Sequence, residues 1–410
     1  MRWLVANGWC SNFKLSPKIF PDSGRGLMAR EPIKAGDTIV KIPSKLLITV
    51  STVSSSGIGH LFDCGQIFST QQVLAAYLVW EKHLGRGSFW DSYISLLPSS
   101  FNSPLFCSED QLIGFPLFIR NKVNEMKTKL DFLFEDLLIV LSSKVCYHCN
   151  RKYSDFYTKN DFMWAWFIVN SRAVYISPSH NNDHTIKLCD DNSLALAPYL
   201  DMLNHSDDAK VQAYLLEQDG TYCLRTLVGY RKYEEVFIHY GSHSNLKLYL
   251  EYGFVLPENK NDVVSLDFSE LLSAISSVFR FNAECSSYKY KMLKSHDMLK
   301  NLYLNADGFS WNVKVVIYVL LCPSTVELKS LYRKIFSDGF SPAEVDNIIL
   351  VGKHLASVKS EEMLGYLRDI ESLCSSEPNN ESLQLCLDLL NHLSGVLNKC
   401  MTVLENSSVI

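Results

Sequence analysis

The stretch YLDMLNHS, residues 199–206, decides how this 410-residue chain is interpreted. It follows an apolar run and places the amide of Asn204 beside the imidazole of His205. An amide can both donate and accept hydrogen bonds, and an imidazole can be a ligand, a base or a packed core ring. Alone, the pair is as consistent with a turn as with a binding site, so the rest of the chain has to decide.

The composition is that of a folded protein with about two or three domains. Apolar residues make up 47% of the chain and charged residues 20%, and the length exceeds that of one ordinary core. The formal charge is -5 without a block of basic residues, so we expect no direct binding to nucleic acid. No apolar stretch approaches the roughly 20 residues that span a bilayer, and the N-terminus lacks a secretory signal pattern. We expect no membrane segment, and a location in the cytoplasm, the nucleus or both.

Twelve cysteines are scattered along the chain without a repeating spacing, which is typical of reduced, mostly buried thiols in a chain of this length. Only CYHC, residues 146–149, has the spacing of metal ligands. A zinc site needs a second ligand pair at a matching distance, and the sequence has none within the usual spacings. We therefore expect no bound metal.

Extended segments begin the chain. Residues 26–49, GLMAREPIKAGDTIVKIPSKLLIT, carry a Lys-Ala-Gly-Asp turn between two β-branched and apolar runs, which predicts a β-hairpin. Strands are predicted again at residues 211–217 and 222–228, around an Asp219-Gly220 turn, and at residues 234–241.

Helical periodicity interrupts these strands. It begins at Gln71, continues as an apolar stripe at every third or fourth position over residues 119–141, and returns over residues 160–175. Beyond residue 256 the pattern is helical, with a capping box at residues 341–344 and a last amphipathic helix from about Glu381. A β-rich domain is thus followed by a helical one, with a boundary near residues 256–263.

Four short motifs are candidates for chemistry, and each has an ordinary structural alternative. The glycines of SGRGL, residues 23–27, allow close approach to a ligand or form a plain turn. Arg172, at the end of an apolar helix, can clamp a carboxylate or reach to water. The third motif is DMLNHS. The fourth, residues 238–254, holds the pairs Tyr240-Gly241 and Tyr252-Gly253, which line a pocket or end core elements.

In this order the motifs resemble the SET-domain protein methyltransferases of the plant Rubisco large-subunit lysine methyltransferase type. The likeness extends over essentially the whole chain and includes FWDSYISLLP, residues 89–98. It implies an α+β fold: a SET domain over residues 1–256 with a helical insertion at about residues 60–165, and an all-α substrate-binding domain over residues 257–410. It also implies a pseudoknot-like SET core that brings residues 201–206 against the segment bearing Tyr240 and Tyr252.

The resemblance implies S-adenosyl-L-methionine as the cofactor. Ser23, Gly24 and Arg25 match the loop whose backbone holds the methionine part, and Arg172 matches the arginine near its carboxylate. A further segment matches the residues over the amino group and adenine: Asp201, Met202, Leu203, Asn204 and His205. In that segment Asn204 is implied to contact the cofactor, whereas His205 is implied to act through its backbone.

Two tyrosines match positions close to the reacting atoms. Tyr252 matches the catalytic tyrosine, which also borders the cofactor, and Tyr240 matches a residue lining the lysine channel. The related actin-histidine methyltransferase lacks the tyrosine of the Y-G-F motif, whereas Tyr252 is present here, which favours lysine as the acceptor. No cysteine-rich zinc cluster follows the motif, so the helical tail is implied to complete the substrate site.

The function expected from the resemblance is S-adenosylmethionine-dependent methylation of a lysine in a histone or another protein, by a chain that is a monomer. Two alternatives stay open. One is an enzyme with another acceptor, such as histidine or an N-terminal amine. The other is a catalytically silent module that binds a protein partner through its helical domain.

Overall fold

The computed structural model describes residues 1–10, 14–177, 185–216, 218–280, 286–323 and 328–406. Contacts between residues divide the chain into two compact units. The first unit comprises Met1–Phe101 and Asn121–Ser242, and the second comprises Asn102–Arg120 and His243–Ile410.

Three small sheets form the β-structure of the first unit. The largest has the strand order β1-β2-β9-β6, in which only the β6–β9 pair is parallel. The second has the order β3-β8-β7, and the third pairs β4 with β5. The strands are β1 (Leu15–Phe20), β2 (Gly24–Ala29), β3 (Thr38–Ile42), β4 (Ala173–Tyr175), β5 (Leu194–Leu196), β6 (Asn204–His205), β7 (Val211–Leu215), β8 (Tyr222–Thr226) and β9 (Glu235–Ile238).

One apolar cluster lies between these strands. Leu27 of β2, Ile42 of β3 and Val236 of β9 have no exposed surface, and neither has Leu203, which directly precedes β6. Burying each such side chain stabilises the fold by about 1.5–3 kcal/mol. The same cluster therefore fixes the positions of the 23–27, 201–206 and 234–241 segments.

The predicted hairpin over residues 26–49 is wrong in its pairing. The turn itself is present, because the backbone nitrogen of Asp37 donates to the carbonyl of Lys34 and Gly36 has a φ of +93°. However, β2 pairs with β1 and β9, whereas β3 pairs with β8. The intervening residues bridge Ile33 to Tyr230 instead. β3 thus pairs with a strand nearly 200 residues away and not with β2, its neighbour in sequence.

The second predicted hairpin is confirmed. β7 and β8 pair antiparallel from Val211↔Thr226 to Leu215↔Tyr222, and Gly220 has the positive φ of +67° that the turn requires. Glu217, the last residue of the predicted 211–217 strand, lies outside the described residues. The strand predicted within residues 234–241 is β9.

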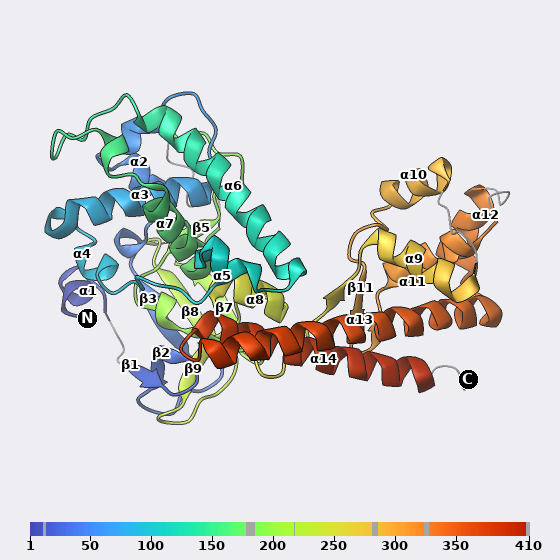
Figure 1. Cartoon of the computed structure of the whole chain (residues 1–410). Coiled ribbons are helices and arrows are strands. Elements are labelled where there is room, and N and C mark those ends of the chain that lie inside the picture. Colours follow the sequence, from blue (N-terminus) through green and yellow to red (C-terminus); the bar gives the residue numbers. More distant parts are fainter. Residues whose placement is uncertain (11–13, 178–184, 217, 281–285, 324–327, 407–410) are drawn as a thin grey trace. The chain divides into compact units, whose positions relative to one another are not determined.

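Helices and turns make up most of the chain between β3 and β4, where the insertion at about residues 60–165 was expected. Figure 1 shows α3 beside α7, which it contacts. Helix α6 is the predicted long amphipathic helix, with Val123, Leu130 and Leu137 buried. The helices up to this point of the chain are α1 (Arg2–Ala6), α2 (Val50–Ser54), α3 (Thr70–Leu84), α4 (Asp91–Ile94), α5 (Glu109–Ile113), α6 (Leu117–Leu141) and α7 (Lys159–Arg172).

The second unit is mostly helical, and its two longest helices, α13 and α14, lie side by side (Figure 1). The predicted capping box is present, because Ser341 and Glu344 cap α13 with Pro342 at its first turn. The helices are α8 (Asn245–Tyr252), α9 (Phe268–Phe279), α10 (Ser287–Ser295), α11 (Trp311–Leu321), α12 (Leu328–Arg333), α13 (Pro342–Ser376) and α14 (Glu381–Asn406). A small sheet that the sequence did not predict joins β10 (Val264–Ser265), β11 (Tyr303–Asn305) and β12 (Gly308–Phe309).

The two units meet in sequence at Ser242, earlier than the expected boundary near residues 256–263. The reason is α8, which packs on α14: the buried hydroxyl of Tyr249 donates to the carbonyl of Ser382 at 2.8 Å. Residues 102–120 join the same unit, because Ser103 Oγ donates to the carbonyl of Leu250 at 2.6 Å. Contacts thus group the Y-G-F segment with the helical tail.

Within the described ranges, no helix combines the length and the apolar character needed to cross a membrane.

Candidate active site

The G-x-G motif directly follows the turn between β1 and β2 and forms the start of β2. Gly24 has a φ of +71°, and a Cβ added to it would meet no atom within 4 Å, so the backbone is open to a ligand on that side. Gly26 is the opposite case. A Cβ there would overlap Oε1 of Glu235 and come within 2.9 Å of Nδ2 of Asn204. The second glycine therefore leaves space for two polar side chains that lie under the turn.

Asn204 holds this turn in place. Its Nδ2 donates to the carbonyls of Ser23 at 3.3 Å and Arg25 at 3.1 Å, and to Oε1 of Glu235 at 2.7 Å. The hydroxyl of Ser23 donates to the other carboxylate oxygen of Glu235 at 2.5 Å. The resemblance assigns Asn204 to the cofactor, and these bonds give its amide a second task, which is to shape the loop that matches the methionine-binding loop.

Arg172 ends α7 and is joined to Asp201. Its Nη1 donates to the backbone carbonyl of Asp201 at 2.9 Å and lies 3.4 Å from Oδ2 of the same residue. The hydroxyl of Tyr93, from the 89–98 segment, donates to that Oδ2 at 2.8 Å. The side chain of Asp201 is only 3% exposed, against 24% for Arg172. The guanidinium therefore does not simply reach to water but is positioned by a buried carboxylate.

Burial and the opposite charges have opposing effects on the pKa values of Asp201 and Arg172. Burial raises the pKa of Asp201, while the charge of Arg172 and the hydrogen bond from Tyr93 oppose the rise. Burial would lower the pKa of Arg172, but the nearby carboxylate outweighs it and raises that pKa. The arginine is therefore a permanent cation, which suits the carboxylate end of an amino-acid-like ligand.

His205 positions Tyr240. β6 pairs with β9 in parallel, and Nδ1 of His205 accepts the backbone N–H of Tyr240 at 3.1 Å. The two rings stack with centroids 5.1 Å apart, and the hydroxyl of Tyr240 donates to the carbonyl of Leu203 at 2.7 Å. Burial lowers the pKa of His205, so the ring is neutral and structural near pH 7.

Tyr252 belongs to the second unit and is the last residue of α8. Gly253 ends the helix in the left-handed conformation, with a φ of 79°. The ring of Tyr252 is half-buried, with the ring of His243 5.9 Å away and that of Phe254 6.2 Å away. Burial, followed by the charge of Glu251, raises the pKa of its hydroxyl to about 12. The phenol is therefore neutral at physiological pH.

Most predicted site residues of the first unit are thus joined by hydrogen bonds. The side chain of Arg25 is tied down as well, because its Nη1 donates to the carbonyl of Leu96 at 2.8 Å, and Met202 packs against the apolar cluster. The expected contact between the 201–206 segment and the segment of Tyr240 is confirmed, through β6 and His205. The part of that expectation that concerns Tyr252 stays a prediction.

Sequence reasoning missed two residues that organise the site. Glu235 opens β9, and the only signal for it was its place at the start of a predicted strand. Tyr93 lies in α4, within a segment that was noted for its resemblance but given no role. Both residues form hydrogen bonds with residues more than 30 positions away in sequence. The local sequence pattern therefore could not predict these bonds.

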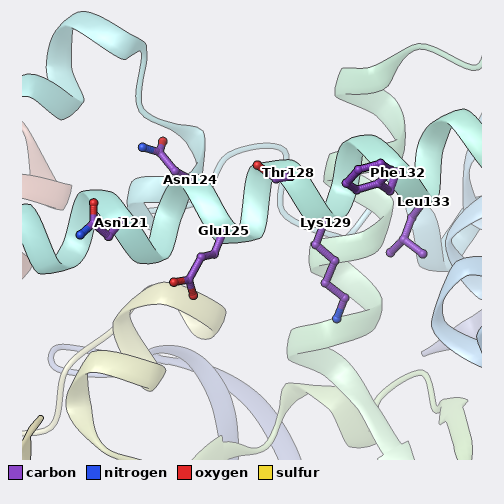
Figure 2. A pocket seen from close by; sticks show the side chains of 7 residues that line it. All are labelled: Asn121, Asn124, Glu125, Thr128, Lys129, Phe132 and Leu133. Atoms are coloured by element: carbon purple, nitrogen blue, oxygen red, sulfur yellow. The ribbon is translucent and has the colours of Figure 1, made fainter. Parts of the chain in front are cut away.

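A separate hollow lies along α6 (Figure 2). In Figure 2, Lys129 points away from the helix axis, and its Nζ lies 5.8 Å from the ring centre of Trp166 on α7. None of the predicted site residues lines this hollow. The lining residues are Asn121, Asn124, Glu125, Thr128, Lys129, Phe132 and Leu133.

Residues 24–241 match the family model described as "SET domain". This range begins at the turn described above and ends just after Tyr240, so it contains every predicted cofactor residue of the first unit except Ser23.

Curated relatives extend the match to the whole chain. SET domain-containing protein 4 from Artemia parthenogenetica is 31% identical over 99% of this chain and 95% of its own length. The human protein of the same name is 30% identical over 92% of this chain and 87% of its own length. Human actin-histidine N-methyltransferase is 29% identical, over 65% of this chain and 43% of its own length.

Solved structures agree in fold. The SET domain of LSMT bound to lysine and AdoHcy superposes with a TM-score of 0.60 at 18% identity, covering all of this chain and 90% of the other. Rubisco LSMT bound to AdoMet gives 0.59 at 19% identity, covering 100% and 91%. Together with the family match and the relatives, these comparisons show that the chain belongs to the SET-domain family of methyltransferases.

Proposed function

We propose that this chain transfers a methyl group from S-adenosyl-L-methionine to the side-chain amine of a lysine in a protein, histone or non-histone. The observation that carries the proposal is the set of bonds that joins the 23–25 turn, the 201–205 segment and Tyr240. The turn is bonded to Asn204, and Leu203, one residue earlier, accepts the hydroxyl of Tyr240. A ligand held by the turn is thereby brought near a tyrosine.

The cofactor supplies a methyl group that is activated on a sulfonium. The open backbone at Gly24, the cation of Arg172 and the 201–205 segment are the parts of the chain that fit its amino-acid portion. We assign Tyr252 to the orientation of the acceptor amine, because its hydroxyl, with a pKa raised to about 12, stays neutral and can take part in hydrogen bonds without adding charge.

The chemistry explains why the site needs few charged groups. Methyl transfer to an amine is a direct displacement, so the protein has to align and desolvate the reactants rather than move many protons. A lysine of pKa near 10.4 has to be neutral to react, which costs about 4 to 5 kcal/mol at pH 7. Apolar, tyrosine-lined surroundings next to a cation reduce that cost by lowering the pKa of the lysine.

Histidine is the second candidate acceptor, and the similarity to actin-histidine N-methyltransferase is the observation that favours it. The presence of Tyr252 at the Y-G-F position supports lysine instead. A third possibility is a silent module that binds a partner without catalysis. For either enzyme we expect a monomer with a protein substrate captured by the helical second unit, located in the cytoplasm, the nucleus or both.

The decisive experiment incubates the purified chain with S-adenosylmethionine labelled in its methyl group. The probes are core histones, actin and a total protein extract, and labelled proteins are hydrolysed and separated into methylated amino acids. Methyl-lysine supports the proposal, and label confined to methylhistidine contradicts it. Calorimetry with S-adenosylmethionine is run in parallel, because absence of binding by the folded chain would favour the silent module.

A further inference from the structure

The helical insertion contains a cluster of metal-ligating side chains that methyl transfer does not use. His83, Cys146 and Cys149 each offer one ligand atom, and these three atoms lie within 4.8 Å of one another. Nε2 of His83 and Sγ of Cys149 lie 3.2 Å apart. All three residues belong to the first unit, and none of them is among the predicted cofactor residues.

The backbone around CYHC has the form of a tight loop closed on itself. The N–H of Cys146 donates to the carbonyl of Arg151 at 2.8 Å, and the N–H of Asn150 donates back to the carbonyl of Cys146 at 2.8 Å. A β-bridge between Val145 and Lys152 closes its base, and Asn150 takes the left-handed conformation, with a φ of +56°. Both thiols are thereby held in one short, hydrogen-bonded turn.

The third ligand is held equally well. His83 lies in the last turn of α3, and its ring stacks on Phe156 with centroids 3.6 Å apart and planes 8° from parallel. On the other side of the loop, the ring of Tyr147 lies over Gly57, where a Cβ would overlap its hydroxyl. The loop and the histidine are therefore positioned by packing, without any help from a ligand.

A buried polar atom points independently to a charged group at this place. Tyr153 has no exposed surface, and in the described part of the chain its hydroxyl has no hydrogen-bond partner. A buried hydroxyl without an acceptor is unfavourable by about 1–3 kcal/mol. A metal-bound thiolate at Cys146 would provide a negatively charged acceptor.

We propose that His83, Cys146 and Cys149 bind one Zn²⁺ ion, which joins the end of α3 to the loop between α6 and α7. A set of two thiolates and one imidazole binds zinc in preference to harder cations. In a tetrahedral zinc site the ligand atoms lie about 3.5 to 3.8 Å apart, so small rotations of the three side chains suffice. Binding displaces the protons of the two thiols into solvent, and no electron is transferred.

The fourth ligand is water or His148, which lies between the two cysteines in sequence and is exposed. In the sequence, only CYHC has the spacing of metal ligands. His83 is identified as the third ligand only by the structure, in which the end of α3 lies beside the CYHC loop. The ion would act as a cross-link within the insertion, because its ligands come from two segments separated by more than 60 residues.

The test measures zinc in the full-length chain, purified under reducing conditions and without chelators. After loading with ZnCl₂ and removal of unbound metal, we expect about one zinc per chain by mass spectrometry of the metal. Cys149→Ser and His83→Ala should each lose most of it. The matched controls are Cys64→Ser and His60→Ala, whose side chains are exposed, and both should retain zinc. Equal zinc in all five proteins, or none in the parent chain, overturns the proposal.

Two further measurements do not depend on variants that could unfold. Cobalt loaded into the parent chain should show the intense visible bands of a tetrahedral ion and a thiolate charge-transfer band, and their absence contradicts the site. A strong chelator should lower the melting temperature of the parent chain, and added zinc should restore it. An unchanged melting temperature in a zinc-loaded protein would overturn the cross-linking role.

Variants of Tyr153 and His148 test the affinity for zinc in more detail. Tyr153→Phe should weaken zinc binding about tenfold in competition with a coloured chelator, because it removes the donor to the thiolate. His148→Ala decides the fourth ligand: a large loss of affinity identifies His148, and an unchanged affinity identifies water. An unchanged affinity in Tyr153→Phe would contradict the arrangement around Cys146.

Discussion

The side-chain amide of Asn204 donates a 2.7 Å hydrogen bond to the carboxylate of Glu235, whose other oxygen accepts the hydroxyl of Ser23 at 2.5 Å. One carboxylate thus joins β6, which carries Asn204, to Ser23 in the turn that directly precedes the G-x-G motif. The same amide reaches the carbonyls of that turn directly. The shape of the turn therefore depends on residues contributed by β6 and β9.

This relationship predicts that Asn204→Ala and Glu235→Ala each weaken S-adenosylmethionine binding by about 10- to 100-fold, because each removes a charge-assisted hydrogen bond worth about 1.5–3 kcal/mol. The double variant should be hardly weaker than either single variant, since both remove one shared arrangement. Calorimetry on the folded proteins measures this, with the exposed Asp208→Ala as control. Unchanged affinity in Asn204→Ala would contradict its assignment, and full additivity would contradict the shared turn.

A second prediction concerns the space under the turn. Gly26→Ala should lower the free energy of unfolding by about 1–3 kcal/mol and reduce cofactor affinity, because the added methyl displaces Glu235 and Asn204. Gly365→Ala on α13 is the matched control: a Cβ there meets nothing within 4 Å, so it should stabilise by about 0.5–1 kcal/mol. Chemical denaturation measures both variants. Equal stability of Gly26→Ala and the parent would show that the turn adapts freely.

Arg172→Ala should weaken S-adenosylmethionine binding through the loss of a cation at the carboxylate end of the cofactor. It also leaves the buried Asp201 without its charged partner, so stability should fall as well. Arg172→Lys separates the two effects, because it keeps the charge but not the planar fork. Calorimetry and thermal unfolding are compared for both variants. Normal affinity in Arg172→Ala would restrict this arginine to a structural role.

The prediction for Tyr252→Phe is a folded, cofactor-binding and nearly inactive protein. If the hydroxyl orients the amine, its interaction strengthens in the transition state, and kcat should fall by about 10- to 1,000-fold. If Tyr252 only ends α8, stability should change by at most about 0.5–1.5 kcal/mol and turnover should hardly change. Single-turnover kinetics decides, with the exposed Tyr175→Phe as control. A variant within about threefold of the parent would leave Tyr240 as the next candidate.

The pH profile provides a fifth prediction. Burial raises the pKa of Tyr252 from 10.0 to about 12, so the stability that its neutral form contributes is complete below about pH 10 and is lost as the pH rises from there through about 12. kcat/KM should therefore rise from about pH 7 to pH 10, as the acceptor lysine loses its proton. A decline within that range that Tyr252→Phe abolishes would show that the hydroxyl ionises earlier.

The parts of the fold that sequence predicts correctly are those determined locally. The β7–β8 hairpin follows from the Asp219-Gly220 turn, and the start of α13 follows from the Ser341 capping box. The pairing of β2 and β3 was predicted from the same kind of signal and is wrong, because strands can choose distant partners. Proximity in sequence does not determine which edge a strand pairs with.

The site, like the fold, has features that the sequence predicts and features that it does not. Its residue types and order were enough to identify the family, but the Tyr93–Asp201 and Asn204–Glu235 bonds join segments that no periodicity relates. His83 and the CYHC loop are a third example, with more than 60 residues between them. Such contacts depend on how elements pack, and one sequence without a structure contains no record of them.

The bond between Tyr240 and His205 determines the tautomer of the imidazole. Nδ1 accepts a backbone N–H, so the ring proton of the neutral form resides on Nε2, which faces Oδ1 of Asp207 at 3.5 Å. Protonating Nδ1 would make this N–H and the backbone N–H of Tyr240 face each other without an acceptor between them. Because burial lowers the pKa of His205 below 6.5, its contribution to stability is complete above about pH 6.5 and is lost as the pH falls through the lowered pKa. Acid should therefore release the Tyr240 segment from β6 by turning an acceptor into a donor.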